Sequence, residues 1–152
     1  MSETVPRREQ QQIDVRGPRF SAAITMTVLA LALIIRGPVG MALVAWQTAA
    51  FAVAAIAGLR WSPYGNLFRA VKRRFDLGPP PETEPEGPPR FAQASGLVFT
   101  LAALAAFAVG AQTVGWVLTG VVLALSALLA LTGICVGCEL YLVGQRLRSR
   151  GA

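Results

Sequence analysis

The sequence predicts an all-α transmembrane protein, a four-helix bundle built from two repeated helical hairpins with a short amphipathic helix between them. Apolar residues make up 54% of the 152 residues and charged residues only 14%, an excess that soluble domains do not usually carry. No Asp, Glu, Lys or Arg occurs between Phe91 and Val136, and a soluble helix would not stay uncharged for so long. Because the lipid core admits only helices or closed barrels, and the apolar runs show no alternation of period two, each run is expected to be a helix.

The first hairpin is expected to follow a polar N-terminal segment, residues 1–19. Its helices are predicted at about residues 20–35 and 39–59, on either side of the helix-breaking sequence Arg36-Gly37-Pro38. The first run is slightly shorter than the roughly 20 residues that cross a bilayer core of about 30 Å, so it is expected to span with little tilt or with local thinning.

The second hairpin is predicted within residues 91–144, with helices at about 91–111 and 114–136. The connection around Gln112 is so short that the two helices must be antiparallel neighbours. The sequence leaves open whether the last helix extends to residue 144. A basic tail, residues 145–152, follows.

The central segment, residues 60–90, changes character along its length. Apolar and basic residues first alternate at helical spacing, which predicts a short amphipathic helix lying at the membrane interface. From Leu77 to Pro89 the chain is rich in Pro and Glu and is expected to be a linker. The residues predicted to contact lipid headgroups and to fix the topology are Arg19, Arg60, Arg69, Lys72, Arg73, Arg74 and Arg90.

The distribution of positive charge predicts the orientation. Every Lys and Arg except Arg36 lies on one side of the predicted bilayer. The positive-inside rule then places both termini and the central segment in the cytoplasm. Because these charges flank apolar segments and form no folded basic face, nucleic-acid binding is not expected.

The two hairpins share a sequence pattern, which predicts an internal repeat. Gly17-Pro18-Arg19-Phe20 precedes the first hairpin and Pro88-Pro89-Arg90-Phe91 precedes the second. Proline starts a helix well, and the arginine and the aromatic ring are typical of the interface. Aligned through Gly58 and Gly133, the two copies place Arg60 opposite Cys135.

One motif could carry chemistry, namely Cys135-Val136-Gly137-Cys138-Glu139. Its two cysteines are the only ones in the chain, and their i, i+3 spacing on a helix would let the sulfurs meet. Cys135, Cys138 and Glu139 are therefore the candidate catalytic residues, with Cys138, beside Glu139, favoured as the attacking thiol. Two Cys and one Glu leave a tetrahedral metal site incomplete, so neither a metal nor another cofactor is predicted.

The reactivity of this pair depends on the course of the last helix. If the helix runs unbroken to Arg146, its C-terminal dipole and Glu139 both disfavour a thiolate. If Gly133 or Gly137 ends the helix and a new one starts near Cys135, the dipole favours a thiolate. Glu139 could accept a proton from a thiol or pair with an interfacial arginine, and the cysteines could also be buried apolar residues of a packed helix.

Four ordered motifs carry a resemblance to a known family: RGPRF before the first hairpin, SPYGNLFR after it, PPRFAQ before the second, and CVGCELY after it. From about Asp14 to Leu147 the chain resembles a family of small bacterial four-helix membrane proteins catalogued as a domain of unknown function. The resemblance implies the topology, a bacterial plasma (inner) membrane location and the Cys-x-x-Cys-Glu element, but no established activity.

The leading functional hypothesis is a cytoplasm-facing thiol-disulfide or sulfur-relay protein that exchanges with a thioredoxin-like or sulfurtransferase partner. The first alternative is a non-catalytic scaffold or assembly factor that binds another membrane protein through its helices, which are rich in Ala and Gly. The second is a small transporter, disfavoured because no run of polar residues lines any predicted helix. The lipid bilayer is a partner in each case, and homo-oligomerisation stays open.

Overall fold

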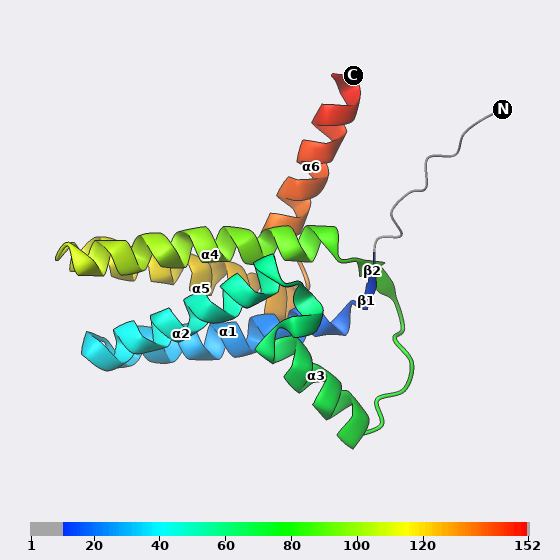
Figure 1. Ribbon diagram of the computed structural model, residues 1–152, viewed down its shortest axis with the longest axis horizontal. Coiled ribbons are helices and arrows are strands. Elements are labelled where there is room, and N and C mark those ends of the chain that lie inside the picture. The colour runs from blue at the N-terminus through cyan, green and yellow to red at the C-terminus, as the bar shows by residue number, and fades with distance from the viewer. Residues whose placement is uncertain (1–10, 152) are drawn as a thin grey trace.

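Four long helices run side by side in the computed structural model, which describes residues 11–151 (Figure 1). Each is long and apolar enough to cross a membrane, as the sequence predicted. The protein is therefore an integral membrane protein with a helical bundle. The four helices are α1 (Arg16–Ile35), α2 (Gly37–Ile56), α4 (Gly87–Ala108) and α5 (Gln112–Thr132).

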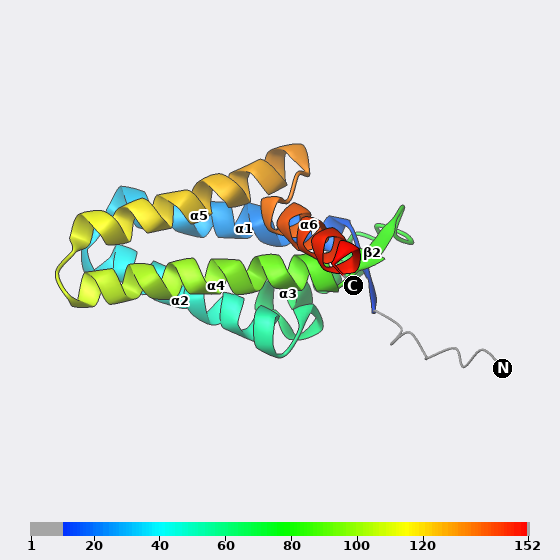
Figure 2. The same cartoon turned by 90° about the horizontal axis from the view of Figure 1, so that it is seen from above.

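Each of the four long helices packs against two others. Helix α1 packs against α2 and α5, and α4 packs against the same two helices (Figure 2). Helices α1 and α4 begin, and α2 and α5 end, at one end of the bundle, which we call the entry end. The turns at Arg36 and Gly110 form the opposite, hairpin end.

Several helix boundaries differ from those expected. Helix α1 begins at Arg16 rather than at residue 20, and at 20 residues it reaches full spanning length. Helix α4 begins at Gly87 rather than at residue 91. In both cases proline lies in the first turn, where its missing N–H has no partner within the helix anyway. Helix α5 ends at Thr132, before both of the expected ends at residues 136 and 144.

The remaining elements gather at the entry end (Figure 1). A single 3₁₀ turn and helix α3 follow α2, and helix α6 follows α5, so the expected basic tail is largely helical. Helix α3 packs against α1, and α6 packs against α4. The bounds are η1 (Leu59–Trp61), α3 (Pro63–Arg74) and α6 (Val136–Arg150).

Two short strands pair where the sequence predicted only a polar segment and a linker. Strand β1 (Gln12–Asp14) is antiparallel to β2 (Thr83–Pro85), with Ile13 opposite Glu84. The strands directly precede α1 and α4. The sheet therefore ties together the starting points of the two hairpins.

The core of the bundle is small and apolar, and it includes Leu29, Val44, Phe51, Ala103 and Phe107. Many large apolar side chains face outward instead. Such an outer surface would be unfavourable in water, but it is the expected surface of helices surrounded by lipid.

A polar network that the sequence pattern did not predict lies inside this apolar bundle. Gln47, in the middle of α2, has a solvent-exposed fraction of 0%. Its amide donates to Thr25 of α1 at 3.1 Å and accepts from the Tyr64 hydroxyl of α3 at 2.7 Å. The Trp46 indole donates to the same hydroxyl at 3.1 Å. These bonds connect α3 to two helices of the bundle.

Arginines of the two Pro-Arg-Phe elements reach across to the other hairpin. Arg90 donates to the carbonyls of Ala55 and Ile56, both at 2.7 Å, at the end of α2. Arg19 donates to the carbonyl of Ala130, near the end of α5, at 3.3 Å. Each guanidinium therefore meets carbonyls at the negative end of a helix dipole.

Aromatic pairs also correspond between the halves. Phe20 of α1 packs on Phe68 of α3 with ring centroids 5.5 Å apart, and Phe91 of α4 packs on Tyr141 of α6 at 5.6 Å. The short helix of each half is thus seated by an aromatic contact on the first long helix of the same half.

Candidate functional site

The chain bends sharply just before the cysteine motif. Gly133 adopts a left-handed conformation with φ of 78°, which glycine reaches without steric cost, and its N–H donates to the Leu129 carbonyl at 2.9 Å. The Ile134 N–H donates to the Thr132 hydroxyl at 3.2 Å. Of the alternatives left open by the sequence, the structure therefore has the break at Gly133 and a new helix directly after it.

Cys135 is the N-cap of this new helix. Its backbone is extended, with φ of −101° and ψ of 105°, and its Sγ accepts a hydrogen bond from the Cys138 N–H at 3.2 Å. Cys135 and Cys138 form a disulfide, with their Cα atoms 5.2 Å apart. Both sulfurs lie at the positive end of the α6 dipole, the arrangement that favours a thiolate.

The cysteine pair is held against α4 by close packing. A Cβ on Gly137 would lie 2.8 Å from the Cβ of Ala92, so only glycine allows this approach. One turn later, Tyr141 packs on Phe91 and approaches Gly87. The first turns of α6 are therefore positioned by α4, while the rest of the helix extends away from the bundle (Figure 1).

Exposed apolar side chains precede and follow the half-buried cysteine pair in the sequence. Leu131 and Leu140 are 72% and 61% exposed, and Ile134, directly before Cys135, is 53% exposed. The pair lies just outside the four membrane-length helices. Its surroundings thus combine lipid-facing side chains with the polar entry end.

Glu139 does not lie within an apolar span. It is exposed in the first turn of α6, and its N–H donates to the Cys135 carbonyl at 3.0 Å. Among residues 11–151 its carboxylate makes no hydrogen bond or ion pair, so pairing with an arginine, one of the two alternatives left open by the sequence, is not observed. Within the same residues, no three His, Cys, Asp or Glu side chains gather closely enough to hold a metal ion.

The sequence alignment of Arg60 with Cys135 is wrong in structural terms. Cys135 is the N-cap of α6, and the N-cap of α3 is Ser62. The 3₁₀ turn η1 adds residues before α3 that have no counterpart before α6. Arg60 instead lies over the Trp61 ring, with its guanidinium carbon 5.4 Å from the ring centroid.

The predicted basic residues fall into three groups. Arg19 and Arg90 bind main-chain carbonyls of the bundle. Arg73 and Arg74 are exposed near the end of α3. The others, Arg60, Arg69 and Lys72, line a cavity between α3 and the start of α1.

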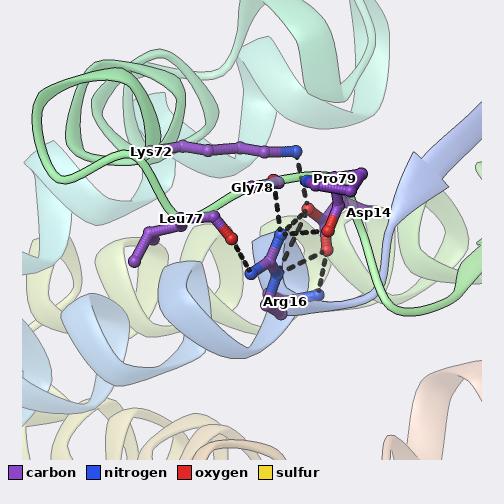
Figure 3. Close-up of polar contacts among 6 residues, drawn as sticks. All are labelled: Asp14, Arg16, Lys72, Leu77, Gly78 and Pro79. Atoms are coloured by element: carbon purple, nitrogen blue, oxygen red, sulfur yellow. Dashed lines mark hydrogen bonds and ion pairs between the residues drawn. The ribbon is translucent and has the colours of Figure 1, made fainter.

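Asp14 organises the polar contacts beside this cavity, as Figure 3 shows. Its carboxylate accepts from Arg16 at 2.9 Å and from Lys72 at 3.0 Å, while Arg16 also donates to carbonyls of the loop after α3, that of Leu77 at 3.2 Å among them. Burial opposes ionisation of Asp14, but the hydrogen bonds from Arg16 and Lys72 outweigh it and lower its pKa to about 2. Asp14 therefore stays charged at neutral pH and ties β1 to α1 and α3.

Two residues that tie α3 to the rest of the molecule, Gln47 and Asp14, were not predicted from the sequence. Gln47 is an uncharged polar residue in the middle of an apolar run, a signal that could have singled it out. Asp14 carries no comparable local signal for its contact with α3, because Lys72, its partner there, is 58 residues away.

Of three comparisons with known proteins, one gave a match. The family described as "Domain of unknown function (DUF4395)" matches residues 13–146, which is nearly the whole described chain. Neither a curated protein nor a solved structure gave a significant match.

Proposed function

We propose that this chain, which belongs to the family described as a domain of unknown function (DUF4395), is a membrane thiol protein whose Cys135–Cys138 pair cycles between disulfide and dithiol. One observation carries the proposal. The pair caps the first turn of a helix outside the membrane-length segments, and a backbone N–H donates to the sulfur of Cys135. A buried structural cysteine would need neither feature.

The proposed location is a bacterial plasma membrane with both termini in the cytoplasm. Among the described residues, every Lys and Arg except Arg36 lies at the entry end or beyond it. The positive-inside rule supports a cytoplasmic entry end on this basis. The natural exchange partner is then a soluble cytoplasmic thioredoxin-like protein or sulfurtransferase.

Cys135 is the better candidate for the attacking sulfur, in place of the Cys138 favoured by the sequence alone. A Cys135 thiolate would keep the Cys138 N–H bond and face the positive end of α6. Glu139, exposed beside Cys138, is the proposed acceptor of the proton that Cys138 must lose.

The exchange proceeds in two balanced steps. The Cys135 thiolate attacks one sulfur of a partner disulfide, which forms a mixed disulfide and releases one partner thiolate. Cys138 then loses its proton and attacks the Cys135 sulfur, which restores the Cys135–Cys138 disulfide and releases the second partner thiolate. The chain gives up two electrons and two protons, and the partner gains two thiols.

Sulfur relay uses the same site with a different cargo. The Cys135 thiolate would accept a sulfane sulfur from a partner persulfide, leaving the partner as a thiolate. Attack by Cys138 on the Cys135 sulfur would then release the cargo as hydrosulfide and close the disulfide, whereas attack by an acceptor thiolate on the outer sulfur would pass it on.

Trapping in intact membranes tests the proposal. The Cys138→Ser variant should accumulate a mixed disulfide through Cys135 with a cytoplasmic protein, because the resolving sulfur is missing. The matched Cys135→Ser variant should trap much less. If both cysteines of the parent resist oxidants and alkylating reagents in native membranes, the proposal is wrong.

The rival function is a scaffold or assembly factor, which the exposed apolar face of α6 favours. Leu140, Val143 and Leu147 are all exposed on this projecting helix. A scaffold would keep its activity in a Cys135→Ser, Cys138→Ser double variant, whereas a thiol protein would lose it. Complementation of a deletion strain therefore separates the two functions.

A further inference from the structure

A cavity of about 260 Å³ lies at the entry end between β1, α1 and α3, and it reaches Gln93 of α4. Among the described residues, its lining has three cationic side chains, those of Arg60, Arg69 and Lys72, and one carboxylate, that of Asp14. Asp14 is already bound to Arg16 and Lys72. The cavity therefore has an excess of positive charge.

The cations are held in place by the protein itself. The Nη2 of Arg69 donates to the Arg60 carbonyl and to the Asn66 side chain, which leaves the donors on its other two nitrogens without a partner among residues 11–151. Lys72 is fixed by Asp14 at 3.0 Å, and Arg60 rests on the Trp61 ring. Arg60 and Arg69 are exposed, so these contacts restrict the side chains in part and reduce the freedom that would be lost when a ligand binds.

The lining also has an apolar part, which includes Leu59, Pro18 and Phe68. Phe68 is buried and packs on Phe20, so this wall is rigid. A cavity that combines converging cations with an apolar wall, beside membrane-spanning helices, suits a phosphate group attached to a less polar body.

We propose that this cavity binds a phosphate-bearing ligand, with Arg60, Arg69 and Lys72 around the phosphate and Phe68 and Leu59 against the rest of the molecule. Two sources share this chemistry, a phospholipid headgroup and a soluble phosphate ester. The site differs from general attraction of a basic helix to anionic lipid. Arg73 and Arg74 carry the same charge on α3, the helix of Arg69 and Lys72, but do not line the cavity.

This distinction gives a matched test with the full chain in nonionic detergent. Arg60→Gln and Arg73→Gln remove the same charge, one inside the cavity and one outside it. The probes are phosphatidylglycerol, quantified by mass spectrometry of the retained lipid, and glycerol 3-phosphate, titrated by tryptophan fluorescence. Because Trp61 lies beside Arg60, its emission should respond to an occupied cavity.

The parent chain is expected to bind at least one probe, and Arg60→Gln should weaken that binding about tenfold, the usual order for a lost charge-assisted contact to phosphate. Arg73→Gln should change it little. Binding of phosphatidylglycerol alone identifies a lipid headgroup as the source, glycerol 3-phosphate alone identifies a soluble ester, and both identify the phosphate itself.

Two results would overturn the proposal. One is that the parent binds neither probe, and the other is that Arg73→Gln weakens binding as much as Arg60→Gln, which would reduce the effect to surface charge. Circular dichroism of each variant separates loss of binding from loss of fold. Arg60→Lys, which keeps the charge, should recover part of the affinity in a folded chain.

Discussion

The two halves of the molecule have the same order of helices but differ in how the last, short helix is attached. In each half two long helices are followed by a break and a short helix at the entry end. Helix α3 is attached by the buried Tyr64 and Phe68 in its first half, with Tyr64 bonded to Gln47, and by Lys72, which binds Asp14. Helix α6 has no buried residue and is held only near its start, by Gly137 and Tyr141.

The difference in attachment gives α3 a structural role, whereas α6 leaves the cysteine pair accessible. The first half uses its short helix to complete the bundle and to form the basic cavity. The second half leaves its short helix projecting and places the cysteine pair at the attached end, where the sulfurs are positioned but still half exposed. A reactive pair needs both conditions, because a partner must reach sulfurs whose geometry is already fixed.

The largest loss of stability should come from substituting the glycines that directly follow the turn of each hairpin. A Cβ on Gly40 would lie 2.6 Å from the Ala32 carbonyl oxygen, which belongs to the backbone and cannot move aside, whereas the atoms nearest to one on Gly115 would be those of the Phe107 ring. We expect Gly40→Ala to cost about 3 kcal/mol and Gly115→Ala about 2 kcal/mol, since the Phe107 side chain can shift within the core more easily than the backbone can. Unfolding by sodium dodecyl sulfate in mixed micelles would measure both.

Equal costs at Gly40 and Gly115 would show that the two hairpins pack alike and would remove this part of the comparison. Gly120→Ala is the matched control. Its Cβ would meet nothing within 4 Å, so the substitution should leave stability nearly unchanged.

The second largest loss of stability should come from disrupting the polar network around Gln47. Gln47→Leu leaves the Tyr64 hydroxyl without its acceptor and the Thr25 hydroxyl without its donor, so we expect a loss of about 2 kcal/mol. Helix α3 should also loosen, and trypsin should cut faster after Lys72 and Arg73. Digestion followed by mass spectrometry would measure this change.

Val122, buried in the second long helix of the other half, provides the control for Gln47. Val122→Ala should lower stability without speeding cleavage in α3. If Gln47→Leu and Val122→Ala change the digestion of α3 equally, the network does not anchor this helix.

The smallest effect should come from the crossing arginines. Arg90 makes two bonds of 2.7 Å to carbonyls of α2, whereas Arg19 makes one of 3.3 Å to a carbonyl of α5. In the same unfolding assay, we expect Arg90→Gln to lower the free energy of unfolding by about 1 kcal/mol and Arg19→Gln by about a few tenths of a kcal/mol. Equal effects that disappear without anionic lipid would instead assign both arginines to headgroup binding.

The sequence by itself determined the membrane-spanning framework. A run of apolar residues long enough to cross the bilayer must satisfy its backbone hydrogen bonds internally, so it forms a helix whatever its neighbours are. The amphipathic pattern around Phe68 predicted α3 on similarly local grounds, because helical periodicity depends only on nearby residues. The cysteine pair was found from its spacing alone.

Only the tertiary structure decided where the last apolar run breaks and what surrounds the cysteines. Gly133 and Gly137 were equally able to end a helix, since glycine permits a left-handed conformation without requiring one. Gly137 is instead needed for contact with Ala92 of α4, so the break falls at Gly133 and Cys135 becomes a helix cap. The partners of Gln47 and Asp14 and the pairing of β1 with β2 depend in the same way on segments distant in sequence, and a local pattern carries no information about them.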